Sequence, residues 1–139
     1  MVEAAANRLR ALEDREAIRE LIARYGPLAD AGEAQAVAAL FAEDGVYAVG
    51  GMGVARGRAE IAALIDGPVH RSLMAAGCAH VLGPVAITLD GDRATACGHS
   101  LVIRAGEGGY ELFRASANRW ELVRTPDGWR GSRRDNRLI

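Results

Sequence analysis

Apolar residues recur at steps of three and four in the first part of the chain, a spacing that places them on one face of an α-helix. Between residues 9 and 25 they are Leu9, Leu12, Ile18, Leu21, Ile22 and Tyr25. Gly26 and Pro27 follow. Proline has no amide hydrogen and its ring crowds the preceding turn, so we expect the helix to kink or loosen there. Gly32 then permits a stop, which predicts that Asp30 lies at the end of the first helix.

Two shorter helices and one strand are predicted before residue 77. A second helix is indicated by three apolar residues, Val37, Leu40 and Phe41. Residues 46–48 have the character of a short strand and precede a glycine-rich bend at residues 50–53. A third helix is indicated by Ile61, Leu64 and Ile65. Gly67 and Pro68 should end it, which would leave His70 inert in a loop.

From residue 77 onward the chain has the pattern of strands separated by turns. Four strands are predicted, at residues 78–90, 93–105, 110–123 and 129–139, and the turn sequences DGD, GEGG and TPDG divide them. Gly83 and Pro84 interrupt the first strand, as a bulge or bend would. The pattern predicts an antiparallel meander. With the three helices on one face of a curved sheet, it gives a single α+β domain over residues 1–139.

Alternation along each strand assigns side chains to the two faces of the sheet. On the second long strand we place Cys97, His99, Leu101 and Ile103 on the inward face. On the third, the inward face holds Ser116, Asn118, Trp120 and Leu122. Polar side chains that continue a core face need buried partners or a wet cavity, and a ligand pocket is the simpler explanation. A register change at Gly83 and Pro84 would turn His80 toward the same pocket.

Composition and charge narrow the classes of function. Half of the 139 residues are hydrophobic, a quarter are charged and the net charge is -1, which argues against disorder and against a nucleic-acid partner. The clustered arginines near the C-terminus, Arg130, Arg133, Arg134 and Arg137, are interpreted as a solvated strand end. No segment approaches the roughly 20 apolar residues that cross a bilayer, so we expect no membrane partner and a cytoplasmic location.

Two cysteines, Cys78 and Cys97, lack the spacing of a zinc site. We interpret both as reduced thiols that serve as small apolar packing residues, and we expect no metal.

Five segments resemble, in the same order, the SnoaL-like group of the nuclear transport factor 2-like superfamily, in particular scytalone dehydratase and the bile acid dehydratases. They are LIARYGPLADAG, DGVY, CAHVLG, GHSLV and SANRWELVRTPDGW, and they span nearly the whole chain. The resemblance implies a cone-shaped α+β fold, with helices on a strongly curved antiparallel or mixed sheet that encloses a pocket. It also implies a homodimer or a homotrimer.

The resemblance further implies roles for individual residues. Asp30 and His80 take the positions of a catalytic pair, Tyr47 that of a substrate- or water-binding tyrosine, and Tyr25 that of a helix tyrosine of the bile acid dehydratases. Substrate-binding positions are expected at Ser116, Asn118, Trp120 and His99.

The chain also departs from scytalone dehydratase. A tyrosine that precedes the aspartate in that enzyme is Ala29 here, and its second catalytic histidine falls near Ala105. His99, toward the other end of the same strand, is therefore an open candidate for that histidine's role.

These residues suit acid–base chemistry without a cofactor. A carboxylate beside an imidazole fixes its tautomer and favours its protonated form. In our hypothesis His80, oriented by Asp30, removes a proton next to a carbonyl, while Tyr47 or Tyr25 stabilises the enolate oxygen. The protonated imidazole then assists departure of a hydroxyl. This predicts a dehydratase-type lyase acting on a small hydrophobic, cyclic or aromatic hydroxy-carbonyl substrate.

Three alternatives stay open at this point. The same proton abstraction would serve an isomerase or cyclase of polyketide or steroid-like substrates. The domain could instead be a non-catalytic binder of hydrophobic small molecules, because fold alone does not select a function. Finally, His80 could be a core histidine bonded to a backbone carbonyl, and Asp30 a simple helix-end residue.

Overall fold

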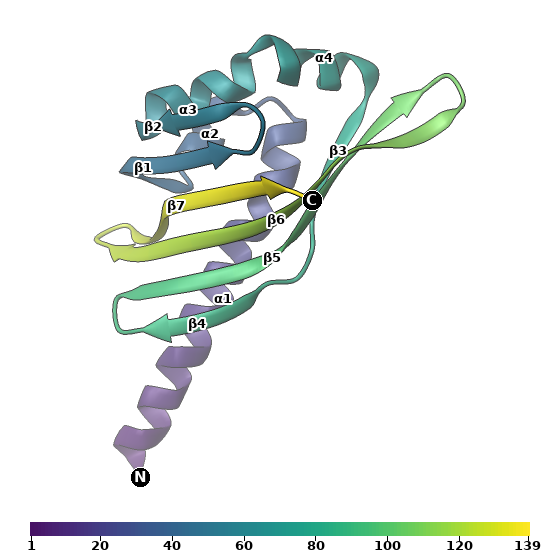
Figure 1. The fold of residues 1–139 in the computed structure, drawn as a ribbon. Coiled ribbons are helices and arrows are strands. Elements are labelled where there is room, and N and C mark those ends of the chain that lie inside the picture. Colours follow the sequence, from purple (N-terminus) through teal and green to yellow (C-terminus); the bar gives the residue numbers. More distant parts are fainter.

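The computed structural model describes residues 1–139 and shows helices packed against a curved, open, mixed sheet (Figure 1). The helices are α1 (Val2–Asp30), α2 (Ala34–Ala38), α3 (Gly57–Asp66) and α4 (Pro68–Ala76). The strands are β1 (Phe41–Val49), β2 (Gly53–Arg56), β3 (Cys78–Leu82), β4 (Ala86–Asp90), β5 (Arg93–Gly106), β6 (Gly109–Thr125) and β7 (Gly128–Leu138). The predicted α+β class is confirmed.

One seven-stranded sheet contains all the strands, in the order β2-β1-β7-β6-β5-β3, with β4 also paired to β5. Only the β1–β7 pair is parallel. The predicted meander is confirmed, with its first strand divided into β3 and β4 around Gly83 and Pro84. Both pieces pair with β5, one along each half of it. As a result β3 contacts α1, while β4 forms an edge of the sheet beside β5 (Figure 1).

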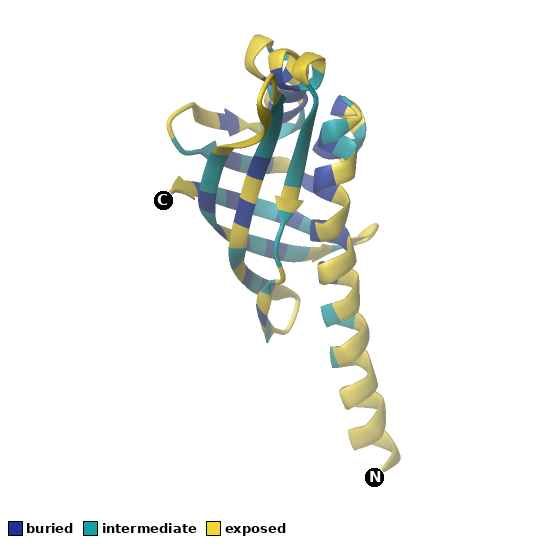
Figure 2. Cartoon of the chain, turned by 90° about the vertical axis from the view of Figure 1, so that its right-hand side faces the viewer, coloured by how far each residue is buried: buried dark blue, intermediate teal, exposed yellow.

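The first helix is longer than its apolar stripe and runs unbroken through Pro27 to Asp30. The predicted burial is confirmed from Ile18 onward, but Leu9 and Leu12 are 57% and 64% exposed. The first half of α1 extends away from the sheet, so nothing covers these leucines (Figure 2). The last turns of α1 pack on the sheet and bring Asp30 to β3.

Two predicted helix boundaries are wrong. Phe41 is the first residue of β1 and lies in the core instead of ending a helix. Pro68 begins α4 instead of a loop, because the first turn of a helix needs no amide hydrogen from its residues. His70 is consequently helical, and only 7% of its surface is exposed.

The face assignment is confirmed for β6 and, on β5, wrong for Cys97 and His99, although Leu101 borders a cavity. Ser116, Asn118, Trp120 and Leu122 are all buried. On β5 the buried residues are Ala94, Ala96, Ser100 and Val102, whereas Cys97 and His99 are exposed. The reason is the register, which pairs Ser100 with Ser116 and His99 with Ala117. Directly paired residues of antiparallel strands point to the same face, so His99 faces away from the core.

A cluster of 21 buried apolar residues joins the helices to the inner face of the sheet, with Phe41, Ile18, Ile61 and Trp120 fully enclosed. No helix combines the length and the apolar character needed to cross a membrane.

Candidate functional site

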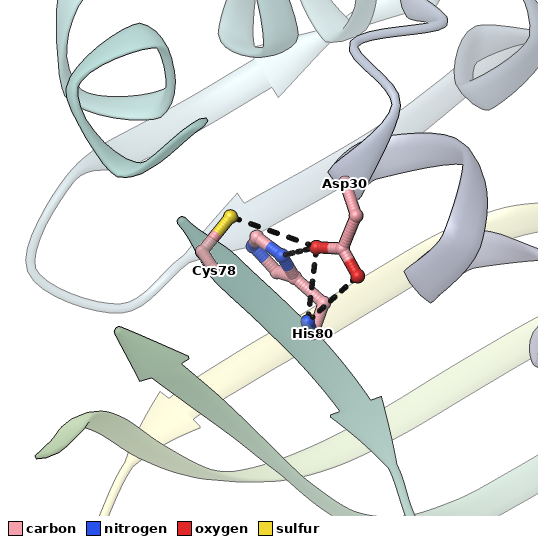
Figure 3. A group of neighbouring side chains, drawn as sticks. All are labelled: Asp30, Cys78 and His80. Atoms are coloured by element: carbon pink, nitrogen blue, oxygen red, sulfur yellow. Dashed lines mark hydrogen bonds and ion pairs between the residues drawn. The ribbon is translucent and has the colours of Figure 1, made fainter. Parts of the chain in front are cut away.

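Asp30 and His80 meet where the end of α1 contacts β3 (Figure 3). Nδ1 of His80 lies 2.7 Å from Oδ1 of Asp30. The backbone N–H of His80 also donates to both carboxylate oxygens, at 3.0 and 3.2 Å. Because an ionised carboxylate only accepts hydrogen bonds, Nδ1 carries the proton and Nε2 keeps a free lone pair. The pairing expected from the sequence is therefore present as an oriented imidazole.

A glycine permits this close approach of α1 to β3. A Cβ atom on Gly26 would lie 2.3 Å from the backbone oxygen of His80, far inside contact distance. The helix reaches the strand because residue 26 has no side chain.

The pKa of His80 is lowered from its ordinary value, mainly because the ring is buried away from water. Asp30 acts in the opposite direction, while the nearby His70 and Arg134 add to the lowering. The carboxylate favours the protonated imidazole, as expected, but desolvation of the ring outweighs this attraction and the net shift is downward. Neutral His80 is the form that can accept a proton.

His80 borders an apolar cavity between the sheet and helices α3 and α4. The space free of protein atoms is about 680 Å³, including the part open to solvent. Apolar side chains dominate the lining: Val49, Met52, Leu64, Ile65, Val69, Leu73, Leu82, Leu101, Val102 and Phe113. The remaining lining residues are Tyr25, Tyr47, His70, His80, Ser100, Arg114, Arg134 and Asn136. A mainly apolar pocket with a few polar groups is typical of small-molecule sites.

Two predicted tyrosines lie together at this cavity. The hydroxyls of Tyr25 and Tyr47 are 3.4 Å apart, and the Tyr25 ring meets the His80 ring edge-on, with centroids 6.2 Å apart. Burial raises the pKa of Tyr25 well above its ordinary value. Tyr25 therefore stays protonated, and its hydroxyl donates to that of Tyr47, whose own proton is left to donate elsewhere.

Arg134 is a site residue that the sequence interpretation missed. Instead of forming part of a solvated strand end, it is 1% exposed and lines the cavity. Its guanidinium lies over the rings of Tyr25, Tyr47 and Trp120, 4.3 to 4.8 Å from their centroids. Nε donates to Asn118, no carboxylate pairs with it, and Nη1 has no partner. A buried cation without a counter-ion favours a ligand with an electron-rich oxygen.

Three of the four residues predicted to bind substrate, namely Ser116, Asn118 and Trp120, are buried but do not line the cavity. Asn118 accepts from Arg134 Nε at 2.8 Å and donates to Ser100 Oγ at 2.6 Å, so it orients two lining residues. Trp120 stacks on Phe41 in the core, and Ser116 Oγ is buried without a partner. His99 does not line the cavity either, because it is on the other face of the sheet.

His70 is a second lining residue that the sequence interpretation missed. Its Nε2 lies 2.6 Å from the backbone oxygen of Ala29, and its ring centroid is 5.3 Å from that of His80. The spacing of Val69, Leu73 and Gly77 fits a short helix, and this pattern was the available signal.

Cys78 completes a cluster with Asp30 and His80, whose potential metal-ligating atoms all lie within 4.8 Å of one another (Figure 3). Its Sγ is 3.7 Å from Asp30 Oδ1, and burial together with the carboxylate raises the pKa of the thiol. The 2.7 Å between Nδ1 and Oδ1 is shorter than the roughly 3.3 Å expected between two ligands of a tetrahedral zinc. In this arrangement Nδ1 and Oδ1 share a hydrogen bond and are not spaced as ligands of one zinc ion.

Cys97 is exposed, so it is not the packing residue we expected.

Comparison with solved structures finds close likenesses. A nuclear transport factor 2-like protein with a cystatin-like fold from Novosphingobium aromaticivorans shares 60% identity, with a TM-score of 0.97 over 100% of this chain and 90% of that one. A protein of unknown function from Mycobacterium tuberculosis shares 25% identity, with a TM-score of 0.84 over 94% and 74% of the two chains. A protein from Catenulispora acidiphila, solved in complex with S-DNPA, shares 22% identity, with a TM-score of 0.74 over 88% and 92%.

No protein with a curated description matches the chain. The SnoaL-like domain family, in contrast, matches residues 10–135, which include Asp30, His80 and Arg134. The fold and this match agree, and the chain belongs to the SnoaL-like domain family of nuclear transport factor 2-like proteins.

Proposed function

We propose that this protein is a cofactor-independent, dehydratase-type lyase for a small hydrophobic hydroxy-ketone with a cyclic or aromatic skeleton. The observation that carries the proposal is the neutral His80, held by Asp30 with its Nε2 free, at the edge of an apolar cavity. A base of lowered pKa is available at neutral pH, and an apolar lining helps to keep water away from an enolate.

The first step is proton abstraction from the carbon next to the ketone. Nε2 of His80 takes the proton, and the electron pair of the C–H bond moves to the carbonyl oxygen, which becomes an enolate. Tyr47, whose hydroxyl accepts from Tyr25, can donate a hydrogen bond to this oxygen, and Arg134 supplies a positive charge, since both line the cavity. Donors that are already oriented stabilise developing charge effectively.

The second step expels water. The enolate electrons return to form a carbon–carbon double bond, and the bond to the β-hydroxyl breaks. That hydroxyl leaves with the proton from His80 as water, which restores the neutral imidazole. One hydroxy-ketone therefore gives one enone and one water, and no oxidant or cofactor is consumed.

The isomerase or cyclase alternative differs only in the second step. If the ligand has no β-hydroxyl, the proton on His80 returns to a different carbon. In a cyclisation the enolate carbon instead attacks a carbonyl carbon, and the alkoxide that forms takes the proton from His80. A purely binding role is favoured by one observation, the mainly apolar lining of the cavity.

Deuterium exchange and water loss test the proposal. Purified protein is incubated in D₂O with cyclohexanone and 3-hydroxycyclohexanone, and α-deuteration and enone formation are followed by NMR. We expect His80→Gln and Asp30→Asn to lower both rates by about 10²- to 10⁴-fold, the usual contribution of a positioned acid–base group. His99→Gln is the matched control, because His99 is exposed outside the cavity. Circular dichroism checks that each variant is folded.

Exchange by His80→Gln at the wild-type rate would overturn the proposal. Binding of both ketones by the wild type without exchange would favour the non-catalytic binder.

A further inference from the structure

His70 occupies the wall of the cavity beside the proposed base. It comes from α4, whereas His80 comes from β3, and the two rings are tilted by 35° with centroids 5.3 Å apart. His70 is 7% exposed and contributes to the cavity lining. The proposed proton abstraction does not use it.

The hydrogen bond to Ala29 fixes the tautomer of His70. A backbone carbonyl only accepts, so Nε2 carries the proton, and in the neutral ring Nδ1 then holds a lone pair. Nδ1 makes no hydrogen bond within the chain. It is also not one of the fully buried polar atoms, so part of its surface is open. The remaining acceptor of His70 is therefore accessible, on a ring that lines the cavity.

The chemistry around this acceptor narrows what it can bind. An acceptor in an apolar pocket is satisfied by a hydrogen-bond donor on the ligand. A cationic donor such as an ammonium group is disfavoured, because buried Arg134 lines the same cavity without a counter-ion. A neutral hydroxyl group satisfies both conditions.

We propose that Nδ1 of His70 accepts a hydrogen bond from a hydroxyl group of the bound molecule, so that the cavity selects hydroxylated over purely hydrocarbon ring compounds. The inference depends on the proposed function only in placing the ligand in this cavity. It makes His70 a specificity-determining residue, and it requires no chemical step.

A matched pair of ligands tests this selection. p-Cresol and p-xylene have nearly the same shape and differ by a hydroxyl in place of a methyl group. Dissociation constants for both are measured by ¹H–¹⁵N NMR titration of the wild type and of His70→Gln. Glutamine can still donate to the Ala29 carbonyl from the position of Nε2, but it has no ring nitrogen at Nδ1. We expect the variant to bind p-cresol about three- to tenfold more weakly and p-xylene unchanged, as for the loss of one hydrogen bond.

Other outcomes overturn the inference. If His70→Gln binds both ligands more weakly to the same extent, His70 only shapes the cavity wall. If the variant binds p-cresol as tightly as the wild type does, or if the wild type does not bind p-cresol, Nδ1 accepts no hydrogen bond from the ligand. If His70→Gln does not fold, the imidazole ¹⁵N shifts of the wild type decide instead. The Nδ1 signal of His70 should move with p-cresol and not with p-xylene, and a shift with neither ligand contradicts the proposal.

The two proposals fail separately. Neither cresol nor xylene has an α-proton next to a ketone, so their affinities do not depend on catalysis. If His70→Gln loses its preference for p-cresol, the role of His70 is supported even when the wild type exchanges no deuterium. If His70→Gln keeps that preference, the role of His70 is contradicted, but the lyase proposal is unaffected.

Discussion

At the residue scale, two opposing effects act on the imidazole of His80. The carboxylate of Asp30 at 2.7 Å stabilises the charged ring, while burial removes the water that would solvate it. Burial is the larger effect, so the pKa of His80 is lowered. Asp30 then serves mainly to fix the tautomer and the direction of Nε2.

This lowered pKa has a consequence for stability that can be measured. The unfolded chain binds a proton at His80 near the ordinary value of about 6.5, but the folded chain binds it only at lower pH. Below about pH 6.5 the unfolded state therefore holds more protons, and the stabilisation falls as the pH falls toward the folded pKa. We expect the free energy of unfolding, measured in urea from about pH 7.5 to about pH 5, to decrease more in the wild type than in His80→Gln.

His99→Gln serves as the control for the loss of a histidine. A steeper decrease in His80→Gln than in the wild type would contradict the lowered pKa of His80.

At the element scale, the site depends on how closely α1 approaches β3. Gly26 lies in the helix, where alanine would ordinarily stabilise the protein by up to about 1 kcal/mol. Here the added Cβ would lie 2.3 Å from the backbone oxygen of His80, so steric overlap decides the sign.

We expect Gly26→Ala to destabilise the protein by about 1 to 3 kcal/mol, the usual cost of overpacking, and to reduce exchange activity because β3 must move. Thermal unfolding and the D₂O assay measure the two effects. Gly108→Ala, at a position where an added Cβ meets nothing within 4 Å, provides the control. Wild-type stability and activity in Gly26→Ala would contradict the proposed contact.

At the scale of the whole molecule, the cavity is lined by elements far apart in sequence. The end of α1, the α3–α4 pair and strands β1, β3, β5, β6 and β7 each contribute lining residues. The β5–β6 hairpin projects beyond the rest of the sheet (Figure 1), and Phe113 on it lines the cavity. Tyr110, Leu112 and Phe113 on this hairpin are 84%, 61% and 40% exposed.

Exposed apolar side chains of this kind favour association. We expect the protein to form a homodimer or a homotrimer, as the sequence resemblance implied. Sedimentation velocity measures the state. Replacing Leu112 and Phe113 by serine should shift it toward the monomer, whereas serine at exposed Leu9 and Leu12 on α1 is the control. A wild type that stays monomeric at high concentration would contradict this expectation.

The sequence by itself determined the local elements and singled out the Asp30–His80 pair. The helical spacing in α1 and the turn sequences between the strands depend on neighbouring residues, so these elements could be predicted without coordinates. The short motifs around Asp30 and His80 are local in the same way, and they carried the resemblance. The α+β class, the meander and the buried face of β6 followed from these patterns.

Only the tertiary structure decided the rest, because it depends on register and on contacts between distant segments. The inward face of β5 is set by its pairing with β6, which puts Ser100 inside and His99 outside. Arg134 resembles a solvated charge in sequence, and its burial follows from the aromatic rings that α1, β1 and β6 bring over it. His70 reaches the cavity because α4 packs its ring against the end of α1. Periodicity along one segment carries no information on such contacts, since each is fixed by where another segment lies.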